Sequence, residues 1–296
     1  MSVPAARLSA QAKVNLTLRV GPRRSDGYHE LATIFARIEL ADDVVVRTLR
    51  GGVTVTVRRA GVPDESVGPP DRNLAVLAAR AYMREADWPT GCAIDIEKRI
   101  PVGAGLGGGS ADAGSVLRAL DSLSPSPLGL DRLTGLAATL GADVPFLTLD
   151  APLALGTGRG DAVEVLDPLP ARWLALVSPP FSISTADAYA WLDADRARRT
   201  LDADAVRAAA RNWDALAAVA TNELQSPVAA RYPVVEAYCD RLRRAGARLA
   251  MMSGSGSAVF GLFDAEPDVV AIGRACNVPV ISTRVPARVV GHLSNE

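Results

Sequence analysis

The chain has 296 residues and a mass of 30.9 kDa, which suffices for one large or two medium domains. Its residues are 49% hydrophobic and 22% charged, as in an ordinary globular protein, and a formal net charge of −1 excludes an overall positive field that would recruit nucleic acid or an anionic membrane. No apolar run reaches the length of a membrane span, and the scattered cysteines Cys92, Cys239 and Cys276 fit buried thiols of a cytoplasmic protein better than disulfides or a zinc site.

The first part of the sequence mixes strands and helices. Residues 44–46 and 53–57 are rich in β-branched side chains and flank Gly51-Gly52, which predicts a β-hairpin. The periodicity then predicts an amphipathic helix over residues 73–83 and a strand over residues 93–96.

Residues 101–111 follow that strand and read Pro-Val-Gly-Ala-Gly-Leu-Gly-Gly-Gly-Ser-Ala, with five glycines in seven positions. Because glycine adopts positive φ without penalty, the N–H groups of such a loop can converge on one anion. A helix is predicted next, with Ser110 as its N-cap and its end near residue 122. A bare loop that leads into a helix N-terminus predicts a phosphate site. A flexible linker is the alternative, but linkers do not join a strand to a capped helix.

Two common phosphate-loop patterns fit this stretch only in part. A Walker A loop needs a lysine before its hydroxyl residue, where this chain has Gly109 before Ser110. A dinucleotide fingerprint needs an acidic residue at the end of the next strand, about 20 residues on, where residues 122–127 predict a loop. The loop is therefore of a third kind.

The rest of the chain predicts a second domain. A helix capped by Asp131 and ended by Gly141 and a strand over residues 161–166 come first, and a boundary is expected near residues 167–170. Beyond it, apart from additional helices, the elements follow the order β-α-β-β-α-β of the split βαβ sandwich. The strands are expected at residues 173–177, 248–252, 258–263 and 280–283, and the helices at residues 185–192, 204–220, 233–245 and 267–276.

Only two of the 32 basic residues are lysines, Lys13 and Lys98. A lysine ammonium is compact and tunable, unlike the broad guanidinium fork. Both lysines are therefore candidates for positions where the size or the chemistry of the side chain matters. Two lysines among 32 basic residues can also arise by chance.

Several motifs together resemble the GHMP small-molecule kinases, and most of all their branch that acts on a cytidine-diphosphate-linked methylerythritol. Besides the glycine loop, they are Ala12-Lys-Val-Asn-Leu16, Asp26-Gly-Tyr-His29, Leu140-Gly-Ala-Asp-Val-Pro145 and Ser253-Gly-Ser-Gly-Ser-Ala-Val-Phe260. They stand in that family's order and span nearly the whole chain. The resemblance implies an α+β, two-domain fold with a cleft between an N-terminal ribosomal-protein-S5-domain-2-like domain (residues 1–166) and a C-terminal ferredoxin-like domain (residues 167–296).

The resemblance also implies a catalytic pair. Asp143 matches the aspartate that takes the proton from the attacking hydroxyl, and Lys13 matches the lysine that orients it and favours its ionised form. Without the motif, Asp143 would be interpreted as a turn residue. Ser110 could place its hydroxyl on a phosphate or on Mg²⁺, and simple N-capping is its alternative.

ATP and Mg²⁺ are the implied cofactors. The residues expected at the nucleotide are Pro101, Val102, Gly103, Ala104, Gly105, Leu106, Gly107, Gly108, Gly109, Ser110 and Ala111 of the loop, with Asn73, Leu74 and Lys98 beside the adenine. Helix capping explains Asn73 equally well. Some relatives have a second serine where this chain has Ala111.

The acceptor site is expected to bind a cytidine-diphosphate-linked sugar alcohol. Aromatic rings would sandwich the base while His29 reads its polar edge, and Tyr189 stands where the family has phenylalanine, a change that stacking tolerates. The residues assigned to this site are Asn15, Tyr28, His29, Thr185, Tyr189, Gly254 and Ser255. For the turn at residues 253–256, a hairpin connection is an equally simple interpretation.

We therefore expect a cytoplasmic, ATP-dependent kinase that phosphorylates the acceptor's 2-hydroxyl, with no nucleic-acid, membrane or obligate protein partner. The alternatives are another GHMP kinase, of the homoserine or mevalonate type, a dinucleotide-binding oxidoreductase, and a non-catalytic nucleotide-binding regulator. Tyr28 and His29 argue against the first, the missing ribose acid against the second, and the presence of both Lys13 and Asp143 against the third.

Overall fold

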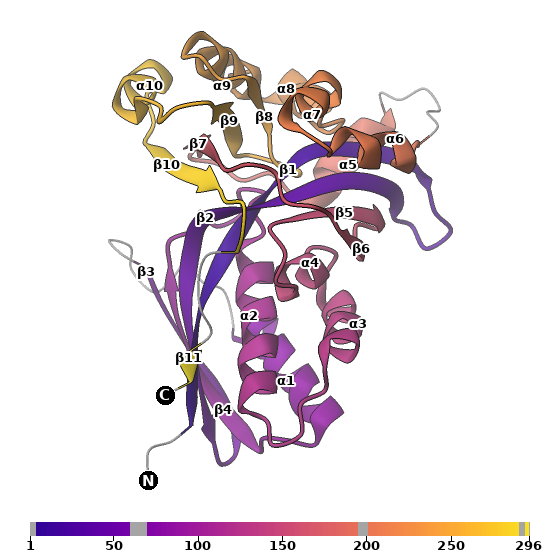
Figure 1. Cartoon of the computed structure of the whole chain (residues 1–296), viewed down its shortest axis with the longest axis vertical. Coiled ribbons are helices and arrows are strands. Elements are labelled where there is room, and N and C mark those ends of the chain that lie inside the picture. The colour runs from indigo at the N-terminus through magenta and orange to yellow at the C-terminus, as the bar shows by residue number, and fades with distance from the viewer. Residues whose placement is uncertain (1–3, 60–69, 195–200, 290–293, 296) are drawn as a thin grey trace.

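Two β-sheets organise the molecule. The computed structural model describes residues 4–59, 70–194, 201–289 and 294–295, with a seven-stranded sheet formed mainly by the first half and a four-stranded sheet formed by the second (Figure 1). The second sheet and its helices lie over one end of the long strands of the first (Figure 1). The predicted α+β class is confirmed.

The first sheet is built on a long antiparallel hairpin of β1 (Ala5–Arg23) and β2 (His29–Leu49). Its strand order is β11-β1-β2-β4-β3, and β5 pairs with β2 and with β6. These further strands are β3 (Gly52–Arg59), β4 (Gly91–Lys98), β5 (Leu153–Gly158), β6 (Ala162–Val165) and β11 (Ser294–Asn295).

The predicted hairpin between residues 44–46 and 53–57 is wrong, although both segments are strands. β4 lies between them, antiparallel to β2 and parallel to β3. The chain does turn at Gly51 and Gly52, each at φ +79°. The start of β4 packs against this turn so closely that a Cβ on Gly91 would lie 2.5 Å from the carbonyl oxygen of Gly52. Turn residues predict that the chain reverses, but not which strand pairs with which.

Four α-helices among the described residues accompany the first sheet, and α2 packs against both β1 and α1. They are α1 (Leu74–Ala86), α2 (Gly108–Leu123), α3 (Leu130–Leu140) and α4 (Val144–Thr148). The expected end of α3 at Gly141 is confirmed. Two expected N-caps are wrong. Ser110 is the third residue of α2, whose N-cap is Gly107 at φ +70°, and Asp131 lies in the first turn of α3, whose N-cap is Gly129. Glycine takes both cap positions because each has a positive φ.

The second sheet has the order β10-β7-β9-β8, with antiparallel neighbours throughout. The predicted β-α-β-β-α-β arrangement is therefore confirmed. Its strands are β7 (Arg172–Val177), β8 (Leu249–Met252), β9 (Val259–Phe263) and β10 (Val280–Val285).

Six described helices belong to this half. The single helix expected over residues 204–220 is wrong: Asn212 interrupts it and caps α7 by accepting a hydrogen bond from the N–H of Ala215 at 2.8 Å. The short helix α8 was not expected. The helices are α5 (Thr185–Ala194), α6 (Ala203–Ala209), α7 (Trp213–Val219), α8 (Gln225–Arg231), α9 (Val234–Arg244) and α10 (Val269–Cys276).

Hydrogen bonds from residues of β1 and β2 connect the two halves. The N–H of Leu18 donates to the carbonyl oxygen of Thr221 at 2.7 Å, and the N–H of Leu40 donates to the hydroxyl of Thr283 at 3.0 Å. The chain also returns to the first sheet at its end, where β11 pairs with β1. The boundary between residues 166 and 167 stays a prediction.

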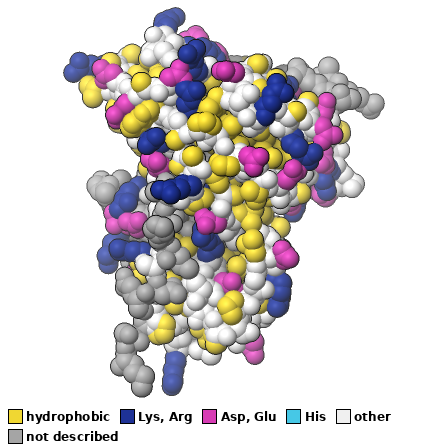
Figure 2. Space-filling model, in the orientation of Figure 1, with side chains coloured by type: hydrophobic (Ala, Val, Ile, Leu, Met, Phe, Trp, Pro, Cys, Tyr) yellow, Lys and Arg dark blue, Asp and Glu magenta, His cyan; other side chains and the backbone are white. Residues whose placement is uncertain are grey.

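The surface carries both signs of charge. Figure 2 shows Lys and Arg side chains interspersed with Asp and Glu side chains on this face, without a large area of one sign. All three cysteines are buried and free, as expected. Among the described helices, none is both long and apolar enough to cross a membrane.

Candidate active site

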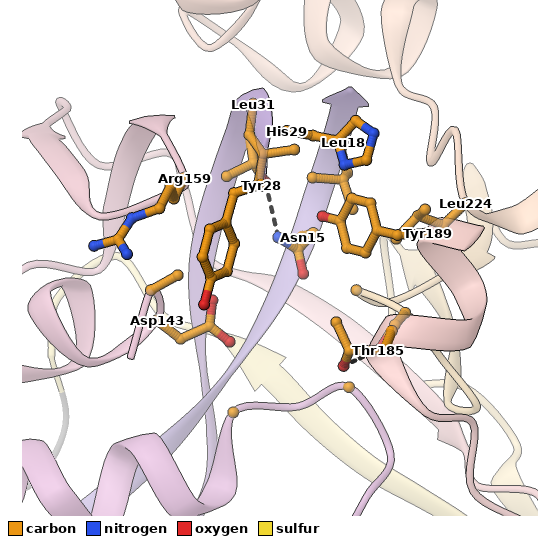
Figure 3. Close-up of a pocket in the computed structure, with 18 of the residues that line it drawn as sticks. Asn15, Leu18, Tyr28, His29, Leu31, Asp143, Arg159, Thr185, Tyr189 and Leu224 are labelled. Carbon is orange, nitrogen blue, oxygen red and sulfur yellow. Dashed lines mark hydrogen bonds between the residues drawn. The ribbon is translucent and has the colours of Figure 1, made fainter. Parts of the chain in front are cut away.

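The sequence motifs converge on one cavity of about 590 Å³ where the two halves meet (Figure 3). β1, the turn into β2, the glycine loop, α5 and the turn between β8 and β9 all contribute to its wall. The expected residues that line it are Lys13, Asn15, Tyr28, His29, Gly105, Gly107, Ser110, Asp143, Thr185, Tyr189, Gly254 and Ser255.

Lys13 and Asp143 form an ion pair in this wall, with Nζ and Oδ2 3.2 Å apart. Lys13 is buried, and its Nζ also donates to Oδ1 of Asn15 at 2.7 Å. Residues two apart on a strand share a face, which explains why Lys13 and Asn15 meet. Asn15 in turn donates to the hydroxyl of Thr33 at 2.8 Å, so the ammonium is held from two sides.

Asp143 stands at the N-cap position of α4, and the other end of this short helix is anchored. The buried guanidinium of Arg37 on β2 donates to carbonyl oxygens of Phe146, Leu147 and Leu149 at 2.7 to 3.2 Å. The last carbonyls of a helix lack a full set of partners inside the helix, and the guanidinium supplies one here, although the carbonyl of Phe146 also accepts the N–H of Leu149. The carboxylate is therefore presented from a fixed helix.

The glycine loop lies between β1 and the turn that joins β8 to β9. Gly103, Gly105 and Gly107 have φ values of +70°, +78° and +70°. The N–H of Lys13 donates to the carbonyl of Leu106 at 3.0 Å, and the N–H of Ala258 donates to that of Ala104 at 3.1 Å. The loop is thereby held on both sides while the first turn of α2 opens toward the cavity.

The expected adenine-side residues lie outside this cavity wall. Asn73 caps α1, because its Oδ1 accepts a hydrogen bond from the N–H of Ala75 at 2.9 Å. Leu74 approaches α2, since a Cβ on Gly109 would lie 3.7 Å from its Cδ1. A contact of either residue with a nucleotide stays a prediction.

Lys98 is bound between two buried carboxylates, Asp42 and Asp112. Its Nζ donates to Oδ2 of Asp112 at 2.8 Å and to Oδ2 of Asp42, whose other oxygen accepts the N–H of Ile100 at 2.9 Å. Burial raises the pKa of Asp112 to about 7, with Lys98 opposing the shift and Asp42 adding to it. A Cβ on Gly108 would lie 3.4 Å from Nζ, so this cluster supports the end of the glycine loop.

Replacing Lys98 by methionine should lower the free energy of unfolding by about 3–5 kcal/mol, because it removes the cation that the buried carboxyl groups of Asp42 and Asp112 share. Urea unfolding measures the loss. An unfolding midpoint equal to that of the wild type would contradict this account.

Asp112→Asn is the matched control, because it removes one buried charge and keeps an acceptor for Lys98. Between pH of about 4 and 7 the folded state binds a proton at Asp112 that the unfolded state has lost, so this group's contribution to stability falls as pH rises. The variant should therefore lose less stability than Lys98→Met and show a flatter dependence on pH in that window.

The far end of the cavity is aromatic. The ring of His29 stacks on Tyr189 with centroids 5.2 Å apart, and its Nε2 lies 2.8 Å from Oδ1 of Asp193. Figure 3 shows Tyr28 and Tyr189 on opposite sides of the cavity. Burial, with a smaller contribution from Asp143, raises the pKa of Tyr189, so its hydroxyl stays protonated. The hydroxyls of Thr185 and Ser255 lie 3.0 Å apart where α5 begins.

Sequence reasoning missed Thr33, Arg159 and Asp193, which also line the cavity. Asp193 follows Tyr189 by four residues, which places both on one face of a helix and could have identified it. Arg159 lies between Gly158 and Gly160, both at positive φ, a pattern typical of a tight turn. Nothing in the local sequence marks Thr33.

Two family models match the chain. The model described as GHMP kinases N terminal domain matches residues 73–150, and that described as GHMP kinases C terminal matches residues 202–277. The first segment contains the glycine loop and Asp143, and the second ends directly after α10.

Named relatives cover most of the chain. The 4-diphosphocytidyl-2-C-methyl-D-erythritol kinase of Geobacter metallireducens is 42% identical over 263 residues, which are 88% of this chain and 90% of that protein. The protein of the same name from Citrifermentans bemidjiense is 41% identical over 264 residues, with the same coverage of 88% and 90%. A crystal structure of 4-(cytidine 5'-diphospho)-2C-methyl-D-erythritol kinase aligns with a TM-score of 0.76 at 36% identity, over 94% of this chain and 98% of that one.

Proposed function

Because the chain belongs to the 4-diphosphocytidyl-2-C-methyl-D-erythritol kinase family of GHMP kinases, we propose that it transfers the γ-phosphoryl group of ATP to the 2-hydroxyl of 4-(cytidine 5'-diphospho)-2-C-methyl-D-erythritol. The chain is an ATP-dependent small-molecule kinase, and the two-domain GHMP fold expected from the motifs is confirmed. The main support for the substrate assignment is that the Lys13–Asp143 pair, the glycine loop and two facing tyrosines line the same cavity.

The glycine loop supports the proposed ATP site by its shape and its charge. The first N–H groups of a helix have no partner inside the helix and attract anions. At Gly107 a Cβ would lie 3.1 Å from Leu147 and from Lys13, so only a glycine leaves the approach to α2 open. We assign residues 103–110 to the phosphates of ATP.

Asp143 is proposed as the base. In this scheme the acceptor hydroxyl gives its proton to the carboxylate, its oxygen forms a bond to the γ-phosphorus, and the bond from that phosphorus to the bridging oxygen breaks to release ADP. Lys13, 3.2 Å from the carboxylate, orients Asp143 and offsets negative charge that gathers between the two substrates.

Mg²⁺ would be held mainly by the phosphates. Among the described residues there is no group of three or more His, Cys, Asp or Glu side chains that could bind a metal ion. Because Mg²⁺ commonly takes few protein ligands beside substrate phosphates, a single hydroxyl fits. Ser110 lies in the first turn of α2 and in the cavity wall, and it is the proposed ligand. When bound, Mg²⁺ supplies charge neutralisation.

The acceptor assignment depends on the aromatic end of the cavity. We place the cytosine ring between Tyr28 and Tyr189, with His29 at its edge and Asn15 nearer the hydroxyl to be phosphorylated. Homoserine and mevalonate carry no base, so a kinase for either needs no such pocket. The cytoplasmic location stays a prediction.

The purified protein should consume ATP much faster with the cytidine-linked alcohol than with other acceptors. Stacking adds about 0.5–1.5 kcal/mol per aromatic pair beyond area burial, and two rings should therefore favour this acceptor over free methylerythritol by well over tenfold in kcat/KM. A coupled assay for ADP, run with both acceptors and with homoserine, measures this preference. Equal turnover of free methylerythritol would contradict the proposed cytidine pocket. Turnover of homoserine alone would favour a GHMP kinase of the homoserine type.

A further inference from the structure

Tyr28 is a large, exposed side chain on a well-fixed backbone. The residue is 58% exposed at the turn between β1 and β2. Its N–H donates to Oδ1 of Asp26 at 3.0 Å, and its carbonyl oxygen accepts the N–H of Arg24 at 2.6 Å. The turn therefore fixes where the side chain starts, while an exposed ring retains rotamer freedom that stacking on a ligand would remove.

Arg159 lies against this ring. Its guanidinium carbon is 5.2 Å from the ring centroid, within the range of a cation–π contact. In Figure 3 it occupies the side of Tyr28 that faces away from Tyr189. The opposite face of the ring is thus left open toward the cavity, where the base is expected.

Arg159 is itself held by its own turn between β5 and β6. Its Nε and Nη2 both donate to Oδ2 of Asp161, at 2.9 and 2.5 Å, and its backbone N–H donates to Oδ1 of the same carboxylate at 3.2 Å. Both nitrogens on one carboxylate restrict the plane of the guanidinium, which is how arginine gains geometric specificity.

We propose that Arg159, fixed by Asp161, is a positioning residue that braces the Tyr28 ring for stacking on the base of the acceptor. Arg159 acts through Tyr28 and contributes to specificity for a nucleotide-linked alcohol. This inference rests on the proposed function of the same cavity.

A double-mutant cycle of Arg159→Met and Tyr28→Ala tests the brace. Arg159→Met should raise KM for the cytidine-linked alcohol about three- to tenfold, the range of a partly exposed cation–π contact, with kcat and KM for ATP changed by less than about twofold. In the Tyr28→Ala background the same substitution should change KM for the alcohol by less than about twofold, because the ring it braces is absent. Arg159→Lys, which keeps a cation, should recover part of the loss.

Arg132→Met is the matched control, because Arg132 is also an arginine paired with a carboxylate, Glu85, but it lies on α3 away from the cavity. It should leave every kinetic constant unchanged. If Arg159→Met has an equal effect with and without Tyr28, Arg159 contacts the substrate directly and the brace is overturned, as it is if the single variant has no effect. If the wild-type protein does not turn over the cytidine-linked alcohol, the proposed function itself fails.

Discussion

Asp143→Asn should lower kcat by at least about a hundredfold while both substrates still bind, because a positioned base contributes about 10²–10⁴ to the rate. Asparagine keeps the size of the side chain and an oxygen that Lys13 can reach, so the 3.2 Å contact can persist without the charge. The amide cannot take the proton of the acceptor hydroxyl. The loss should therefore appear in kcat, with KM values and the fold preserved.

Steady-state kinetics with each substrate varied in turn, together with ligand titration of the inactive protein, measures this separation. Asp240→Asn on α9 is the matched control, since this exposed aspartate is also paired with a cation, Arg243, at 2.8 Å. An Asp143→Asn protein that keeps more than about a tenth of the wild-type kcat would show that another group accepts the proton.

The predicted elements match the structure where the signal lies within a few neighbouring residues. The period of apolar residues and the cap at Asn73 define α1, and short apolar runs mark β7, β8 and β9 of the second sheet. The same local signals fail at β3, where a third strand separates two neighbours in sequence, and at Ser110, where glycines with positive φ begin the helix earlier than a side-chain cap would. Pairing partners and left-handed caps depend on contacts that no short window contains.

For the site, the motifs named the residues but not their partners. Lys13 and Asn15 could be placed together by strand alternation, whereas the approach of Asp143 from α4 needs the tertiary fold. The place of Lys98 beside the adenine stays a prediction, and its ammonium is engaged by Asp42 and Asp112, which lie 56 and 14 residues away in sequence. Buried charges require partners, but a sequence does not say which carboxylates supply them.

Gly105→Ala should lower the free energy of unfolding more than a glycine-to-alanine substitution at any other position of the loop. The residue has φ +78°, a region that costs alanine about 1 kcal/mol or more. Its Cβ would lie 2.3 Å from the carbonyl oxygen of Ser253 and 3.0 Å from that of Gly256, so backbone must move on one side of the contact. We expect the free energy of unfolding to fall by about 2–4 kcal/mol, from backbone strain and overpacking together.

The same shift should weaken ATP binding. The hydroxyl of Ser253 donates to the carbonyl of Gly105 at 3.1 Å, so separating the turn from the loop also moves the N–H groups assigned to the phosphates. Because displaced donors lose charge-assisted hydrogen bonds, KM for ATP should rise at least about tenfold. Gly109→Ala is the control for stability, since its Cβ meets only Leu74, at an ordinary 3.7 Å, inside a helix that favours alanine. Thermal unfolding that shows equal losses for the two variants would mean that the contact with Ser253 does not position the loop.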